Sequence, residues 1–429
     1  YIFDHCTFGW SVEENMNTAD SHFLTVQYSI VHEGLYDAGH SKGARGYGSQ
    51  WGGSPATYHH NLLAHNKSRS PRFNGARGED YVVFMEYINN VNFNFGSNGG
   101  CYGGENTAAI TEYNGLNSAH ECNFINNYYM PGPASSSASN VKFVNSSYAR
   151  DGAKSWAPAK WYVSGNIIKG NSAANADNWK AMQAEGYSLD KIKAAERIIT
   201  KTPYYKYTVM GGVGNYVPAK YMMYDFHTAE EALEIIKQKA GTINRDKVEQ
   251  RLIAELTSGK ATYGGSTAGK TSGIIDTEND CEGFYAYSKD YTVPADSDGD
   301  GMADEWEKAN GLNVSVADQN TLNAEGYTAL EVYLNSLMGE KMDNNFTSGI
   351  ETLPLISAEI NYDTENGLLT VGPEAIGATV SVYGTDGKLH CSQRIKSLTT
   401  YINKKPAGVV LIHVSGKNIL PRMLKAMNK

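Results

Sequence analysis

Short apolar stretches alternate with polar residues through the first 175 residues, and each stretch ends at a pair of residues suited to a turn. The pairs are His5-Cys6, Tyr28-Ser29, His60-Asn61, Asn89-Asn90, Asn126-Asn127 and Gly165-Asn166. Successive pairs are 23, 32, 29, 37 and 39 residues apart, the bounded but uneven period of a solenoid with insertions on some coils. We therefore predict a mainly β protein whose residues 1–175 form a right-handed parallel β-helix. Because strand-like sequence begins at Ile2, we expect further coils to precede Tyr1.

Asparagine recurs at these turns for a physical reason. It tolerates left-handed backbone, and its amide can bond the coil above and the coil below. We expect a ladder of asparagine side chains that satisfies the buried polar groups of the turns. The alternative is that asparagine is simply common in turns.

The pattern changes after residue 176. Apolar residues at helical spacing predict helices over 176–200 and 228–256, with residues 244–246 as a helix entry. We expect residues 176–290 to form a helical and irregular segment packed on the β-helix. Residues 352–429 alternate as strands separated by turn residues, which predicts a small β-sandwich. This module resembles the sorting or attachment modules of secreted Bacteroidetes enzymes, and a plain accessory domain is the alternative.

Charge is distributed unevenly along the chain. The net charge is −9, yet the 36 residues from Lys42 to Arg77 contain no aspartate or glutamate. Six cations lie in this window: Lys42, Arg45, Lys67, Arg69, Arg72 and Arg77. Such a cluster creates a positive electrostatic potential that would attract an anionic partner, although a solvated basic face is the simpler alternative. The overall acidity argues against nucleic acid, and no apolar stretch is long enough to cross a membrane.

The cysteines indicate no metal site and no disulfide framework. Five are scattered, without metal-ligand spacing. We expect buried single thiols, with a Cys101–Cys122 bridge as the alternative.

Acidic residues at fixed spacing occupy residues 296–307, within a segment that we place at 291–340. Their pattern matches the twelve-residue calcium loop of an EF-hand, with glycine at the sixth position. The expected ligands are Asp296, Asp298, Asp300, the Met302 carbonyl, Asp304 and Glu307. One short helix follows, from Glu305 to Asn310, and no long helix precedes the loop. We therefore predict a structural Ca²⁺ clip and not a calcium sensor.

Three further segments carry a specific resemblance. Residues 3–15 read FDHCTFGWSVEEN, residues 59–72 read HHNLLAHNKSRSPR, and residues 126–133 read NNYYMPGP. In this order they resemble motifs of the pectate lyases of polysaccharide lyase family 1. Long bacterial members of that family also carry an acidic loop, so the resemblance covers about residues 1–340.

The resemblance implies calcium-assisted β-elimination of polygalacturonate. By position Arg69 matches the proposed base, and Lys42, which matches a lysine that binds the substrate carboxylate, is the second choice. An arginine normally stays protonated, so a role as base requires nearby cations or a mediating water. Arg72 would bind a uronate carboxylate, or alternatively form a structural salt bridge, and Arg45 and Arg77 would act at neighbouring subsites.

The resemblance also implies a catalytic Ca²⁺ held by carboxylates four positions apart. Here those positions are Glu13 and Asn17, with Glu14 adjacent. Because Asn17 is neutral, we expect weaker calcium binding. A further acidic ligand would come from a coil that precedes Tyr1.

Three functions remain open on these residues. The first is a secreted, periplasmic or cell-surface pectate lyase that acts as a monomer on an acidic polysaccharide. The second is a non-catalytic pectin- or glycan-binding solenoid that has kept the basic cleft and lost the chemistry. The third is a hydrolase on the same fold, which would need two carboxylates facing each other across the cleft.

Overall fold

Two compact units make up the chain, Tyr1–Lys289 and Asp290–Lys429. The structure, a computed structural model, describes residues 1–19, 21, 23–53, 55–75, 83–96, 100–105, 120–147, 158–199, 206–209, 212–215, 223, 226–285, 292–346, 359–402, 408–416 and 419–428. Among these residues, no helix combines the length and the apolar character needed to cross a membrane.

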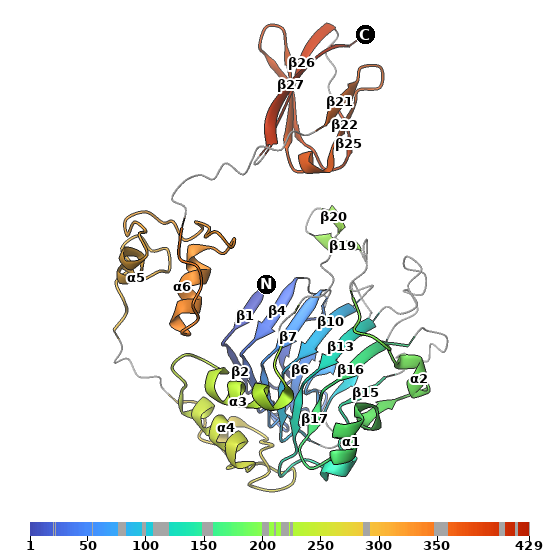
Figure 1. Ribbon diagram of the computed structural model, residues 1–429, viewed down its shortest axis with the longest axis vertical. Coiled ribbons are helices and arrows are strands. Elements are labelled where there is room, and N and C mark those ends of the chain that lie inside the picture. The colour runs from blue at the N-terminus through green and yellow to red at the C-terminus, as the bar shows by residue number, and fades with distance from the viewer. Residues whose placement is uncertain are drawn as a thin grey trace. The chain divides into compact units, whose positions relative to one another are not determined.

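The first unit is built on three parallel sheets of six strands each (Figure 1). The first sheet contains β1 (Ile2–Asp4), β4 (Leu24–Gln27), β7 (Ala56–His59), β10 (Val83–Ile88), β13 (His120–Ile125) and β16 (Lys160–Ser164). The second contains β2 (Thr7–Gly9), β5 (Ile30–His32), β8 (Leu62–Ala64), β11 (Val91–Phe93), β14 (Tyr128–Met130) and β17 (Ile167–Ile168). The third contains β3 (Glu14–Asn17), β6 (Tyr47–Trp51), β9 (Arg72–Phe73), β12 (Tyr102–Gly103), β15 (Val144–Ser146) and β18 (Met182–Ala184). Each strand pairs with its counterpart on the next coil, which confirms the predicted parallel β-helix.

Large aromatic side chains fill the interior of the solenoid. Trp51 stacks on Tyr58 with ring centroids 4.4 Å apart, and Tyr87 stacks on Phe124 at 5.1 Å. All four side chains are fully buried. Cys101 and Cys122 are also buried, and all five cysteines are free thiols, as expected.

The predicted asparagine ladder is present at the turn between the first and second sheets. The side-chain oxygen of Asn61 accepts from the Ser29 amide, and that of Asn90 accepts from the Asn61 amide, both at 3.0 Å. Asn127, Asn166 and Asn178 continue the series at 2.8–2.9 Å. The left-handed backbone lies one residue earlier, at His5, Tyr28, His60, Asn89, Asn126 and Gly165, whose φ values are 45–68°. The stacked asparagine is therefore selected by its amide, and the preceding residue makes the turn.

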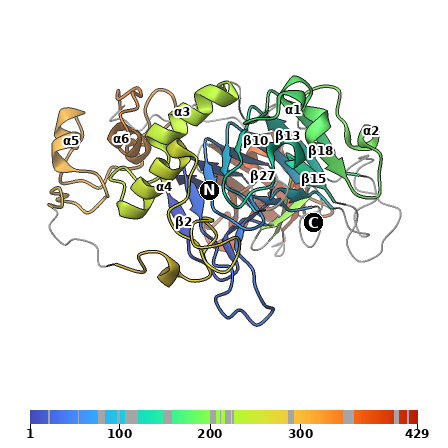
Figure 2. The ribbon, with the colours of Figure 1, turned by 90° about the horizontal axis from the view of Figure 1, so that it is seen from below.

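Two helices cover the second sheet and lie side by side in both views (Figures 1 and 2). They are α3 (Ala229–Lys239) and α4 (Lys247–Ser258), and Asp246 caps α4 as the sequence predicts. Ile236, Leu252 and Leu256 pack on Ile30, Leu62 and Val91 of the sheet.

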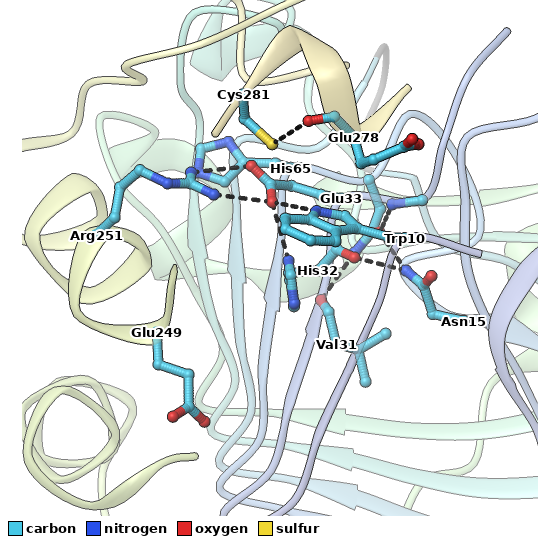
Figure 3. Close-up of polar contacts among 12 residues, drawn as sticks. Trp10, Asn15, Val31, His32, Glu33, His65, Glu249, Arg251, Glu278 and Cys281 are labelled. Carbon is cyan, nitrogen blue, oxygen red and sulfur yellow. Dashed lines mark hydrogen bonds and ion pairs between the residues drawn. The ribbon is translucent and has the colours of Figure 1, made fainter. Parts of the chain in front are cut away.

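Buried ion pairs fasten α4 to the second sheet (Figure 3). Arg251 contacts Glu33 at 2.9 Å, as Figure 3 shows. Glu255 contacts His65 at 2.8 Å. Burial opposes ionisation of Glu33, but the His32 hydrogen bond and the Arg251 charge hold its pKa well below the usual range. The carboxylate is therefore charged and paired.

The predicted helix over residues 176–200 is wrong. This region contains α1 (Ser172–Ala176), a 3-10 turn (Asn178–Ala181), strand β18 and α2 (Leu189–Ile192). Asn178 ends the asparagine ladder, and β18 pairs with β15 to extend the third sheet. Tertiary hydrogen bonds therefore override the helical spacing. A short hairpin of β19 (Lys206–Val209) and β20 (Gly212–Asn215) follows.

The second unit begins with two helices, α5 (Asp304–Ala309) and α6 (Ala329–Leu337). The strands that follow these helices form two antiparallel sheets, and the two sheets share one apolar core. One sheet contains β21 (Ile360–Asp363), β22 (Leu368–Val371) and β25 (Thr399–Tyr401). The other contains β24 (Leu389–Arg394), β23 (Thr379–Gly384), β26 (Gly408–Gly416) and β27 (Ile419–Asn428).

Candidate active site on the third sheet

One row of polar side chains runs along the outer face of the third sheet. The strand register aligns Asn17, Gln50, Arg72, Tyr102, Asn145 and Gln183. Trp51 and Phe73, the next residues after Gln50 and Arg72, belong to the buried core. Because side chains alternate along a strand, the row faces away from the core.

Arg69 lies directly beside this row, in the turn before β9. Its guanidinium contacts the Glu14 carboxylate, and its Nε donates to the Tyr102 hydroxyl at 3.2 Å. The guanidinium carbon also lies 4.0 Å from the centre of the Tyr47 ring. Only 14% of the side chain is exposed, so Glu14, Tyr47 and Tyr102 fix its position. The structure thus brings together the proposed base and a proposed metal ligand.

Arg72 occupies a different environment. It is 6% exposed, contacts the Glu105 carboxylate and donates to the Gln50 side-chain oxygen at 3.4 Å. This is the geometry of the structural salt bridge that the sequence left open as an alternative. Glu105 has no assigned role in the sequence analysis, because nothing in its local sequence identifies Arg72 as its partner.

A loop over residues 33–46 carries Lys42 at an exposed position. The backbone amide of Lys42 donates to His40 Nδ1 at 3.1 Å, which leaves the proton of a neutral His40 on Nε2. That nitrogen lies 3.1 Å from the Glu13 carboxylate. The loop is thereby attached to the turn that precedes β3.

Arg45 and Arg69 share one aromatic ring. Arg45 donates to the Tyr47 hydroxyl at 3.0 Å, while Arg69 lies over the ring itself. Tyr47 carries no signal of a site in the sequence, because its place follows from the strand register. Arg77 lies outside the described residues.

The candidate donors for a catalytic cation are two carboxylates and one amide. Glu13 is partly exposed beside His40, Glu14 contacts Arg69, and Asn17 is exposed on β3. The Asn17 side-chain oxygen accepts from the Ala19 amide at 3.0 Å. Among the described residues, no group of three acidic side chains gathers here. These oxygens fit a Ca²⁺ site only if substrate carboxylates complete it.

A surface hollow of about 400 Å³ continues the outer row beyond Arg72. Its lining includes Lys67, Tyr102, Lys142, Asn145, Gln183 and Glu185. Two ammonium groups, three neutral polar groups and one carboxylate thus border the path from Arg69 toward β18, a polar lining suited to a polyhydroxylated chain.

The acidic loop of the second unit forms a separate cluster. Oxygens of Asp296, Asp298 and Asp300 lie within 4.8 Å of one another. Met302 is buried, and its amide donates to Asp300 at 3.0 Å. The Asp304 carboxylate instead accepts from the amide and the hydroxyl of Ser297, each at 2.7 Å. Asp304 therefore closes the loop through Ser297.

No family model matches the chain. It is similar to curated proteins named "Probable pectate lyase C" from three fungi. It is 29% identical over 339 residues to those of Aspergillus fumigatus and Neosartorya fischeri, and 28% identical over 346 residues to that of Aspergillus flavus. In each case the match covers 79% of this chain and 65% of the relative. The match thus spans slightly less than two thirds of the length of these relatives.

Proposed function

We propose that this chain is a calcium-dependent pectate lyase that cleaves polygalacturonate by β-elimination. The observation that carries the proposal is the position of Arg69, held beside Glu14 on the outer face of the third sheet. The similarity to the fungal proteins supports it independently. Polygalacturonate is an extracellular polymer, so the proposal includes a secreted, periplasmic or cell-surface monomer.

The reaction removes the proton at C5 of a uronate, α to its carboxylate, and expels the oxygen at C4. The electron pair of the C5–H bond forms a C4–C5 double bond. Ca²⁺, when bound by Glu13 and Glu14, would supply positive charge that stabilises the developing enolate. The described side chains around Arg69 offer no Ser-His-Asp arrangement, and β-elimination needs no nucleophile.

Two tasks remain, acceptance of the C5 proton and stabilisation of the enolate, and Arg69 and Lys42 are the candidate residues for them. Arg69 is ion-paired with Glu14, and an arginine side chain normally stays protonated. In its charged form it stabilises the enolate and orients the uronate carboxylate. Lys42, exposed on the loop attached to Glu13, is the second candidate for the proton acceptor.

The test is the ultraviolet absorbance of the unsaturated product on polygalacturonate with Ca²⁺. Wild-type protein should generate this absorbance, and a calcium chelator should abolish it. Arg69→Ala should lower the rate by roughly a hundredfold or more, as expected for loss of an acid–base or charge-stabilising group. Arg394→Ala, a change in the C-terminal sheets, is the matched control.

A second function has a specific observation in its favour. Asn17 is exposed and neutral where the resemblance implies a carboxylate, and the weaker Ca²⁺ binding expected there would favour a solenoid that binds pectin without cleaving it. Saturable binding of oligogalacturonate without any unsaturated product would establish that function and refute the lyase. New reducing ends without the chromophore would instead indicate a hydrolase.

A further inference from the structure

Six buried oxygen atoms beside helix α5 have no hydrogen-bond donor among the described residues. They are both carboxylate oxygens of Asp298 and of Glu307, Oδ1 of Asp318, and Oε1 of Gln319. Glu307 is completely buried. Ionised carboxylates can only accept, so the oxygens of Asp298, Glu307 and Asp318 cannot hydrogen-bond one another. A buried acceptor without a donor is costly, and a cluster of them requires a positive partner.

The cluster is formed by two separate segments. Asp300, Glu307 and Asp318 each place an oxygen within 4.8 Å of the others, and Asp300 also groups with Asp296 and Asp298. The Asp318 amide donates to Asp300 at 3.2 Å, which holds the second segment against the loop. At this separation the negative charges of Asp300, Glu307 and Asp318 repel one another. A fixed cation would relieve this repulsion.

We propose that a hard divalent cation of the calcium class binds here, and that Asp318 and Gln319 complete its coordination together with Asp298, Asp300 and Glu307. All five offer oxygen, the donor that Ca²⁺ takes in shells of about six to eight ligands. The twelve-residue pattern includes Asp304 and omits Asp318 and Gln319. In the structure Asp304 accepts two hydrogen bonds from Ser297, while Oδ1 of Asp318 and Oε1 of Gln319 are buried without a donor among the described residues.

Binding through Asp318 and Gln319 would make the cation a cross-link within the second unit. The Gln319 carbonyl accepts from the Leu330 amide at 3.1 Å, at the first turn of α6. Trp306 of α5 packs on Tyr333 of α6 with ring centroids 5.2 Å apart. Loss of the cation should therefore loosen both helices together. This inference does not depend on the lyase activity.

The experiment is calcium titration of the full chain, with hydrogen exchange measured in peptides covering 304–309 and 329–337. We expect Ca²⁺ to slow exchange in both peptides and a chelator to reverse the effect. Asp318→Asn, which keeps the shape and removes the charge, should weaken this calcium response by roughly tenfold or more, the scale of losing a group that tunes a metal site. Glu305→Gln, an exposed change on α5, should leave it unaltered.

Different results would refute the cross-link, the calcium site or the lyase activity. If Asp318→Asn responds to calcium like Glu305→Gln, the ligands are confined to residues 296–307 and the cross-link is refuted. If calcium leaves both peptides of the wild type unprotected, the site itself is refuted. Circular dichroism and uronide cleavage are measured on each variant. Loss of cleavage with intact calcium protection would count against the lyase alone.

Discussion

The guanidinium of Arg69 contacts the carboxylate of Glu14, although the two residues belong to different coils of the solenoid. Coil stacking brings them together, and Tyr47 and Tyr102 then hold the guanidinium from two further strands. Glu14 thus has two possible tasks, to orient Arg69 and to bind a cation, and these tasks can be separated.

Replacement of Glu14 by glutamine should change the calcium requirement of the reaction. The amide retains an oxygen but loses the charge that attracts both Ca²⁺ and Arg69. We expect the calcium concentration for half-maximal activity to rise roughly tenfold or more, with kcat/KM falling in parallel. Glu13→Gln is the comparison, with a smaller effect because Glu13 contacts His40 and not Arg69. A fall in kcat with an unchanged calcium requirement would show that Glu14 only positions Arg69.

The Arg72–Glu105 pair gives a second prediction. Both side chains are almost fully buried, so removal of one partner deprives the other buried charge of this ion pair. Arg72→Met should cost about 3–5 kcal/mol of unfolding free energy, and the double variant Arg72→Met/Glu105→Gln should cost less than the sum of the two single changes. Urea denaturation measures all three. A raised KM with unchanged stability would instead assign Arg72 to the binding of a uronate carboxylate.

The asparagine ladder gives a third prediction. Asn61 accepts from the Ser29 amide and donates to the Val26 carbonyl at 2.8 Å. Asn61→Ala removes the acceptor of the buried Ser29 amide and one donor to the Val26 carbonyl, and a buried amide left without an acceptor costs about 1–3 kcal/mol. We expect the urea midpoint to fall accordingly, while Asn279→Ala, at an exposed position, leaves it unchanged. Equal midpoints for the two variants would mean that the ladder contributes nothing to stability.

The ladder also shows what the sequence can and cannot predict. A recurring asparagine reports the coil period, because each coil must satisfy the turn of its neighbour, and the parallel β-helix follows from it. The partner of Arg72 cannot be read in this way, since Glu105 meets it only through the register of β9 and β12. Similarly, the spacing of the calcium loop cannot include Asp318, which arrives from beyond α5. Helical spacing over residues 176–200 was misleading because Asn178 and β18 form hydrogen bonds with the last coil of the solenoid instead.

Acid should destabilise the β-helix through its buried histidines, and His60 offers the cleanest test. Burial, with help from the nearby His59, His227 and Lys239, lowers the pKa of His60 from 6.5 to about 3. In the unfolded chain His60 therefore binds a proton below about pH 6.5, whereas in the folded chain it does so only below about pH 3. As the pH is lowered from 6.5 to 3, the free energy of unfolding should therefore fall by about 1.4 kcal/mol per pH unit because of His60 alone. Above pH 6.5 His60 should contribute no pH dependence.

The variant that checks this prediction is His60→Asn. Asparagine occupies the equivalent left-handed position on the next two coils, at Asn89 and Asn126, so the backbone is retained. Between pH 6.5 and 4 the free energy of unfolding should decline less steeply in the variant than in the wild type, by about one proton per molecule. His390→Asn, in the C-terminal sheets, should keep the wild-type slope. Parallel curves for His60→Asn and the wild type would show that His60 takes up its proton in the folded coil, contrary to its buried position.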